Sequence, residues 1–172
     1  MKKYSSHFIF TNTGKPLRRA VITTDDDGTI KAVKDTDGDL QEESSVEFLD
    51  VIAVPGFVNC HCHLELSHLR GAIQKHTGLG EFLVRLQEIR DHGKDEIIGS
   101  AAEADRLLYR EGIVLCADIC NNSLTFGIKA RSRVSYVNLL EVFASDPLAA
   151  SEKMDNILKL YDESAASHIE SW

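Results

Sequence analysis

The sequence contains no uninterrupted apolar segment of the ~20 residues that a membrane-spanning helix requires. It also lacks a secretory signal, because Met1 and the two lysines after it lead into polar residues rather than into an apolar core. We therefore expect neither a membrane partner nor export. The expected location is the cytoplasm.

Basic residues are in the minority, with 19 lysines and arginines against 27 aspartates and glutamates, which gives a formal net charge of -8 at pH 7. On average, the phosphates of nucleic acid and an anionic membrane surface repel an acidic protein. We therefore expect no nucleic-acid partner. A small molecule is the expected binding partner.

Cysteine is also sparse, with four residues in a chain of 172: Cys60, Cys62, Cys116 and Cys120. In a reducing cytoplasm such thiols stay free, so they serve as small core residues or metal ligands rather than as disulfides. Hydrophobic residues make up 43% of the chain, which is the proportion of an ordinary globular protein.

The chemistry of the sequence is concentrated at one apolar segment that ends in two imidazoles and two thiols. Residues 51–58 are interpreted as a short buried strand, followed by His61 and His63. Side chains at i and i+2 of a strand lie on the same face, so the two histidines can project together from its C-terminal end. Two convergent imidazoles make half of a metal site. Paired histidines near a strand end are also commonly a hydrogen-bonded surface or core feature, and spacing alone leaves both interpretations open.

The residues around the pair carry a resemblance to a known family. A run of five residues precedes His-x-His, namely Pro55, Gly56, Phe57, Val58 and Asn59. This run resembles the first barrel strand of the amidohydrolase superfamily of metal-dependent hydrolases. The continuation His63-Leu64-Glu65-Leu66-Ser67 is similar to the deaminase and chlorohydrolase branch of that superfamily. Cys62 departs from the pattern, since the branch usually has Thr or another small residue there. We expect its side chain to point to the opposite face from the histidines.

The resemblance implies an α/β fold, a (β/α)8 TIM barrel preceded by a small N-terminal β-sandwich. It also implies His61 and His63 as metal ligands and zinc, or another divalent transition metal such as iron, as cofactor. The implied activity is hydrolysis of C–N bonds, by deamination of a small heterocyclic or nucleoside-like substrate.

Length limits how much of such a barrel the chain provides. A complete barrel takes about 250 residues, at roughly 30 per βα unit. We therefore expect an N-terminal β-rich subdomain over residues 1–54, then the first three or so βα units over residues 55–172. The chain is expected to be truncated and inactive alone, and its open strand edges favour a homo-oligomer.

Patterns along the chain agree with that division. Short β segments separated by turn sequences are expected in the N-terminal part, at residues 7–11, 19–24, 29–33 and 46–49. Helices alternating with strands are expected afterwards, the helices at residues 80–91, 95–111, 124–130 and 148–166 and the strands at 113–119 and 134–143.

Several residues in this second part have expected structural roles. Gly93 and Gly112 are expected to end the first two helices, and Asp95 to cap the start of the second. In the last helix, Leu158 and Tyr161 lie at helical spacing with Ala165, and this side is expected to cover the sheet.

Loops that follow barrel strands line the active-site face of such a fold. Glu65 and His68 are candidates for substrate contact on this ground, with an exposed loop residue as the alternative for both. Asp118 and Glu141 are candidates too, because the resemblance implies that Asp118 lies at the catalytic end of the second barrel strand, and Glu141 ends the expected third strand. The further metal ligands implied by the family have no match, because His168 falls in the expected last helix. No residue can be assigned as general acid or base.

Two other interpretations stay open. The chain could be a non-catalytic fragment retained for partner binding. It could also be a structural zinc-binding module built from residues 60–63 with Cys116 and Cys120. Alternation along a strand disfavours the module, because the four residues cannot all converge on one metal.

Overall fold

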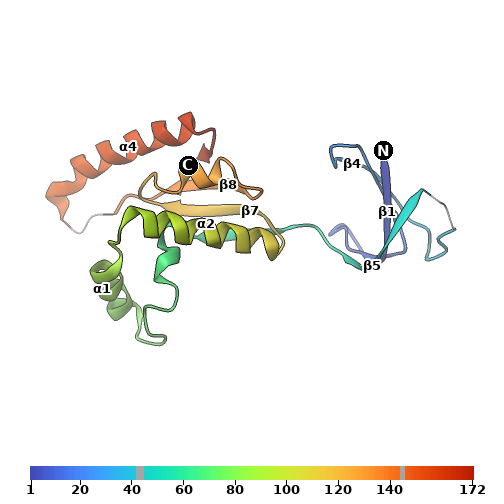
Figure 1. Cartoon of the computed structure of the whole chain (residues 1–172), viewed down its shortest axis with the longest axis horizontal. Helices are drawn as coiled ribbons and strands as arrows, with labels where there is room; N and C mark the ends of the chain where they lie inside the picture. Colours follow the sequence, from blue (N-terminus) through green and yellow to red (C-terminus); the bar gives the residue numbers. More distant parts are fainter. Residues whose placement is uncertain (42–44, 144–145) are drawn as a thin grey trace. The chain divides into compact units, whose positions relative to one another are not determined.

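The computed structural model describes residues 1–41, 45–143 and 146–172. It divides into two compact units, Met1–Pro55 and Gly56–Trp172, as Figure 1 shows. No helix in these described ranges is long and apolar enough to cross a membrane.

The described part of the N-terminal unit forms one five-stranded sheet around its first strand. The strands are β1 (Lys2–Ile9), β2 (Leu17–Arg18), β3 (Val21–Thr24), β4 (Ile30–Lys34) and β5 (Val46–Ala53). Strand β1 pairs antiparallel with β2 and β3 and parallel with β5, and β4 extends the sheet from β3. The described residues of this unit form strands and no helix, whereas the β-sandwich implied by the resemblance is not confirmed.

The predicted strand over residues 51–58 is divided between the two units. Strand β5 ends at Ala53, and a new strand, β6 (Phe57–Cys62), begins the second sheet. Pro55 lies in the gap, where a residue without an N–H cannot continue a hydrogen-bonded ladder. The expectation of a buried strand is also wrong, because Phe57 and Val58 are 55% and 53% exposed. Strand β6 is the edge strand of its sheet, so its flank is unpaired among the described residues.

The second unit alternates parallel strands with helices. Its sheet has the order β6, β7 (Ile113–Cys120), β8 (Ser135–Leu140) and β9 (Glu170–Ser171), and all three pairings are parallel. The connections contain 3₁₀ helices η1 (Leu64–Leu69) and η2 (Pro147–Ala149) and α-helices α1 (Leu79–Ile89), α2 (Lys94–Arg110), α3 (Phe126–Lys129) and α4 (Ala150–Ala166). Figure 1 shows α2 along β7 and α4 beside β8. The α/β class is confirmed, whereas the sheet is open, with β6 and β9 at its edges, so the barrel stays a prediction.

The register places a row of polar residues across this sheet. Asp118 of β7 lies opposite Asn138 of β8, which lies opposite Ser171 of β9. Cys62 of β6 pairs with Asp118 at the other end of the row. This side of the sheet carries the buried core, which includes Cys116, Cys120, Tyr136 and Leu160.

Several helix boundaries differ from the predicted ones. Helix α1 ends at Ile89, and Gly93 is the N-cap of α2 rather than the end of α1. Asp95 therefore lies in the first turn of α2, where its carboxylate interacts favourably with the helix dipole, and is not the cap. Gly112 follows α2 with a φ of 85°, which agrees with its predicted role as a stop.

The last helix packs on a different side from the one predicted. Leu160 and Ser164 of α4 are buried, whereas Leu158 and Tyr161 are 53% and 50% exposed, and Ala165 is exposed too. Both sides carry apolar residues at helical spacing, so periodicity could not choose between them. His168 lies outside the helix, in the turn before β9, with a φ of 57°.

Candidate functional site

The predicted histidine pair is present at the C-terminal end of β6. The ring centroids of His61 and His63 lie 5.2 Å apart, with an angle of 65° between the ring planes. His61 is exposed and His63 is half-buried. The i, i+2 spacing therefore does bring the two imidazoles together.

An extra residue in β6 lies directly beside this pair. Between Asn59 and Cys62 the strand spans three residue steps, whereas the facing segment of β7, from Cys116 to Asp118, spans two. Such a bulge leaves backbone groups without a ladder partner. The side chain of Asn59 accepts a hydrogen bond from the backbone N–H of His61 at 3.2 Å, which satisfies one of them.

Cys62 turns toward the core, as expected, and away from the histidines. It packs against the buried cluster that contains Cys116 and Cys120. Hydrogen bonding to Cys116, together with burial, raises the pKa of the Cys62 thiol well above its usual value. Cys60 is exposed, so the four thiols are dispersed between surface and core. The structural zinc module therefore finds no support in this placement.

A cavity of about 660 Å³ opens beside His63. Asn121 and Asn122, after β7, and Glu141, after β8, contribute polar groups to its wall. The amide Nδ2 of Asn121 donates to the backbone carbonyl oxygen of Glu141 at 2.8 Å, which fixes the two strand ends to each other. Of the four predicted substrate residues, Glu141 lies on this cavity.

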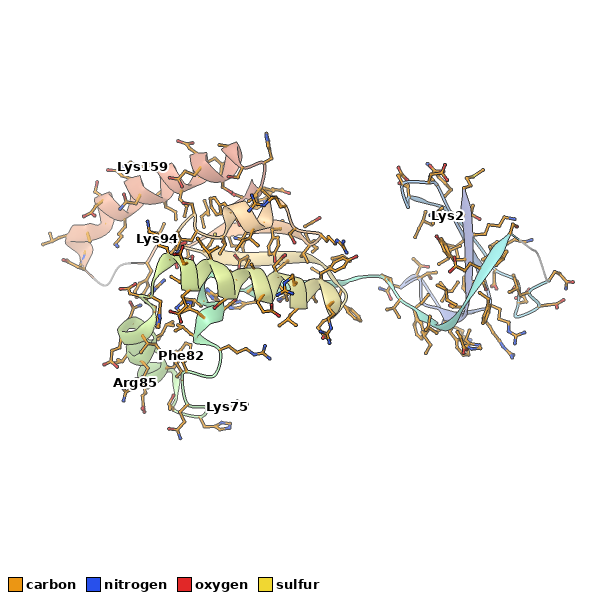
Figure 2. All side chains as sticks on the ribbon, in the orientation of Figure 1. Lys2, Lys75, Phe82, Arg85, Lys94 and Lys159 are labelled. Carbon is orange, nitrogen blue, oxygen red and sulfur yellow. The ribbon has the colours of Figure 1, made fainter. Side chains whose placement is uncertain are left out.

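Helix α1 forms the apolar side of the same cavity. Phe82, Leu83 and Leu86 line it, and Phe82 is 40% exposed. Figure 2 shows where Phe82 lies on α1. None of the eleven residues of this helix is buried. The helix therefore presents apolar surface to the cavity instead of to the core.

Glu65 lies on η1, in the wall of an adjoining cavity of about 430 Å³ that shares Leu66 and Arg90 with the first. It is 2% exposed, and its Oε1 lies 3.5 Å from Nη2 of Arg90. Its Oε2 accepts from the backbone N–H of Asn121 at 3.2 Å. Burial raises the pKa of Glu65, while the hydrogen bond from Asn121 and the charge of Arg90 oppose the rise.

His68 also lies on η1 but faces the helical layer. Its Nε2 lies 3.2 Å from the backbone carbonyl oxygen of Arg90, and its ring meets that of His92 at a centroid distance of 4.9 Å. It lines neither of the two cavities. Its predicted role in substrate binding therefore has no geometric support here.

Asp118 is completely buried and lines neither cavity. Its Oδ1 accepts a hydrogen bond from the backbone N–H of Leu64 at 2.7 Å, and its Oδ2 lies 2.6 Å from Nζ of Lys129. It faces the core side of the sheet with Cys116 and Cys120. Asp118 is therefore buried away from both cavities, whereas the prediction placed it at the substrate.

Sequence analysis did not identify Lys129, Asn138 and Arg90. Lys129 donates to Oδ1 of Asn138 at 2.6 Å, and the side chains of Lys129 and Asp118 are both 0% exposed. The burial of Asp118 could have been predicted, because Asp118 lies two residues from both Cys116 and Cys120 and so shares their face of an apolar strand. No comparable pattern marks Lys129 in its short helix.

The ring separation of the histidine pair is that of two ligands in a zinc shell. A Zn–N bond of about 2.0–2.1 Å puts an imidazole centroid about 3.2 Å from the metal, so two tetrahedral imidazole ligands have centroids about 5.2 Å apart. The observed separation of His61 and His63 is 5.2 Å. However, within the described ranges no group of three or more His, Cys, Asp and Glu side chains is placed to hold a metal ion. A catalytic zinc usually has three protein ligands and an open water position.

Three solved structures of hydrolases share the fold of this chain. Guanine deaminase from C. acetobutylicum, with bound guanine, has a TM-score of 0.70 and 15% identity, over 99% of this chain and 45% of that protein. Helicobacter pylori aminofutalosine deaminase, in complex with methylthio-coformycin, has a TM-score of 0.68 and 14% identity, over 99% and 43%. Atrazine chlorohydrolase from Arthrobacter aurescens, complexed with zinc, has a TM-score of 0.62 and 21% identity, over 94% and 43%.

These matches confirm the predicted resemblance at the level of the fold. The chain has the fold of the N-terminal portion of amidohydrolase-type deaminases and chlorohydrolases. It spans less than half the length of the structures that it matches. No protein-family model and no curated protein matches the sequence.

Proposed function

We propose that this chain supplies the first metal ligands and part of the substrate cavity of an amidohydrolase-type hydrolase. The reaction is hydrolysis of a C–N bond, by deamination of a small heterocyclic or nucleoside-like substrate. The convergence of His61 and His63 carries the proposal, because the pair has the centroid separation of two zinc ligands and one of its members lines a cavity. The solved structures that share the fold include two deaminases, which supports this class of reaction.

His61 and His63 would hold zinc or another divalent transition metal such as iron. A bound metal of this kind supplies a water whose pKa is lowered to about 7. The chain's own residues bind and orient the substrate. Phe82 and Leu86 offer an apolar wall to a flat ring, while Asn121 and the carboxylate of Glu141 offer hydrogen bonds to its polar edge. Glu65 faces the adjoining cavity, where it would accept hydrogen bonds from a substituent.

Two imidazoles hold a metal weakly, because they leave most of its shell to water. We therefore propose that the 172-residue chain alone binds zinc without turning substrate over. Catalysis then requires a third ligand and a general acid or base from protein beyond the described residues. A second copy of the chain or a longer polypeptide would supply them.

Zinc binding and ammonia release by the purified chain test the proposal. We expect about one weakly bound zinc per chain and no ammonia from heterocyclic amines. Changing either histidine, in His61→Ala or His63→Ala, should weaken zinc binding at least about tenfold, because a single imidazole remains. His7→Ala is the matched control, since it removes an imidazole from the other unit and should leave zinc binding unchanged.

Stoichiometric zinc that persists in both His61→Ala and His63→Ala would refute the ligand assignment. Ammonia release by the purified 172-residue chain would contradict the need for further ligands. Zinc is measured by atomic absorption or calorimetry, and ammonia by a coupled assay.

A further inference from the structure

We propose that Asp118 and Lys129 are positioning residues for His63, acting through the backbone of the next residue. The inference rests on the proposed function of the histidine pair. The peptide bond that joins His63 to Leu64 is held at both of its polar atoms. Its N–H donates to Oδ1 of Asp118 at 2.7 Å, and its C=O accepts from the N–H of Leu66 at 2.9 Å.

This peptide bond is where the chain turns from β6 into η1. His63 has a φ of -131° and a ψ of 76°, which lies outside the range of a regular strand. Its own side chain makes no capping hydrogen bond to the helix. The turn is therefore fixed from outside by Asp118, while the imidazole of His63 lies against that of His61. Restricting ψ at this residue also restricts the direction in which its Cβ projects toward the cavity.

Lys129 holds the carboxylate of Asp118 in one orientation. Its Nζ lies 2.6 Å from Oδ2 of Asp118 and donates to Oδ1 of Asn138 at 2.6 Å. Asn138 in turn donates from Nδ2 to Oγ of Ser164 at 2.6 Å. These contacts connect β7, α3, β8 and α4, so Asp118 cannot rotate without breaking a buried contact.

An apolar pair could fill the same space with similar stability, because buried ion pairs contribute little net free energy compared with hydrophobic replacements. What an apolar pair cannot do is accept the hydrogen bond from Leu64. At this place in the sheet, the ion pair therefore fixes the backbone at Leu64 in addition to filling the core. Groups that orient a metal ligand from outside its shell typically change metal affinity by about 10–100-fold.

The experiment compares the wild-type chain, in two measurements, with a variant that carries Asp118→Leu and Lys129→Met, an apolar pair that cannot accept the hydrogen bond from Leu64. The first is zinc affinity by calorimetry. The second is metal-free NMR, in which we follow the amide proton of Leu64 and the nuclear Overhauser contact between the rings of His61 and His63. We expect zinc affinity to fall about tenfold. The Leu64 amide should move upfield and exchange faster, and the contact between the rings should weaken.

Asp105→Leu is the matched control, because it removes an acceptor elsewhere in the second unit. Asp105 is also an acceptor in the helical layer, where its Oδ1 receives hydrogen bonds from Ser132 at 2.5 Å and Tyr136 at 2.8 Å. It makes no hydrogen bond or ion pair with η1 among the described residues, so both measurements should keep their wild-type values. If this double variant does not fold, Asp118→Ala with Lys129→Met takes its place, because it also removes both charges and the acceptor for Leu64.

A folded Asp118 variant with unchanged zinc affinity and an unchanged ring contact would overturn the inference. The two proposals fail separately. If the wild-type chain binds no zinc, the ligand assignment fails, while the metal-free ring contact and the Leu64 amide still decide whether Asp118 positions His63.

Discussion

Replacing Lys129 by methionine should be one of the most destabilising single changes in the second unit. Methionine keeps most of the length and the apolar stem of lysine but removes the charge. Asp118 is then left as a carboxylate with 0% exposure and no cation beside it. Lys129 Nζ also lies over the rings of Phe126 and Tyr136, at 5.4 and 5.7 Å from their centroids, so both cation–π interactions are lost as well.

The magnitude follows from the burial of both partners. Removing one member of a buried ion pair costs about 3–5 kcal/mol, because the other charge is left uncompensated. A domain is stable by only about 5–15 kcal/mol in total. In the paired variant, Lys129→Met with Asp118→Asn, no charge is left without a partner and the Leu64 amide keeps an acceptor. We expect it to recover about 2 kcal/mol or more of the loss.

Urea unfolding followed by far-UV circular dichroism measures these differences, because every α-helix described lies in the second unit. Arg85→Met is the control, since the Arg85–Glu88 pair is exposed on α1 and its loss should change stability by less than about 0.5 kcal/mol. A loss below about 1 kcal/mol in Lys129→Met would refute the reasoning. So would a paired variant that is less stable than Lys129→Met alone.

Two further expectations concern the thiols and the surface. Burial raises the pKa of Cys120 to about 11, so at about pH 8 only about a thousandth of it is thiolate, and a disulfide-exchange reagent should modify exposed Cys60 rapidly but Cys120 only on unfolding. Simultaneous reaction of all four thiols in the folded chain would contradict this. The purified chain should also self-associate, because exposed apolar side chains such as Val58 on the edge strand and Leu158 on α4 have no cover among the described residues. Light scattering that shows a compact monomer at high concentration would contradict the predicted self-association.

The sequence was sufficient for the features that local pattern determines. The i, i+2 spacing of His61 and His63 places both on one face of any strand, and the structure brings their rings together. Gly112 was identifiable as a helix stop because a positive φ after a helix favours glycine. The alternation of strands and helices after residue 56 likewise follows from periodicity.

The features that were missed depend on how faces and strands are arranged in space. A hydrophobic run such as residues 51–58 predicts a strand, but whether it is central or at an edge depends on which strands lie beside it. Sequence analysis expected Asp118 to contact substrate and missed its ion pair with Lys129. That pair joins a strand to a helix eleven residues later in the chain, which no local pattern indicates. Helix α4 has apolar residues on two sides, so tertiary packing rather than its sequence pattern determines which side is buried.

The polar row across the second sheet also bears on how its strands find their correct alignment during folding. A slip of β7 by two residues against β8 keeps each side chain on its own face, but it moves Asp118 from Asn138 to Tyr136 or Leu140. Lys129 could then no longer contact both Asp118 and Asn138, and buried polar groups would be left unpaired. A row made only of valine and leucine would tolerate that slip. The same groups that hold the end of β6 therefore make misaligned sheets unfavourable before any metal or substrate is present.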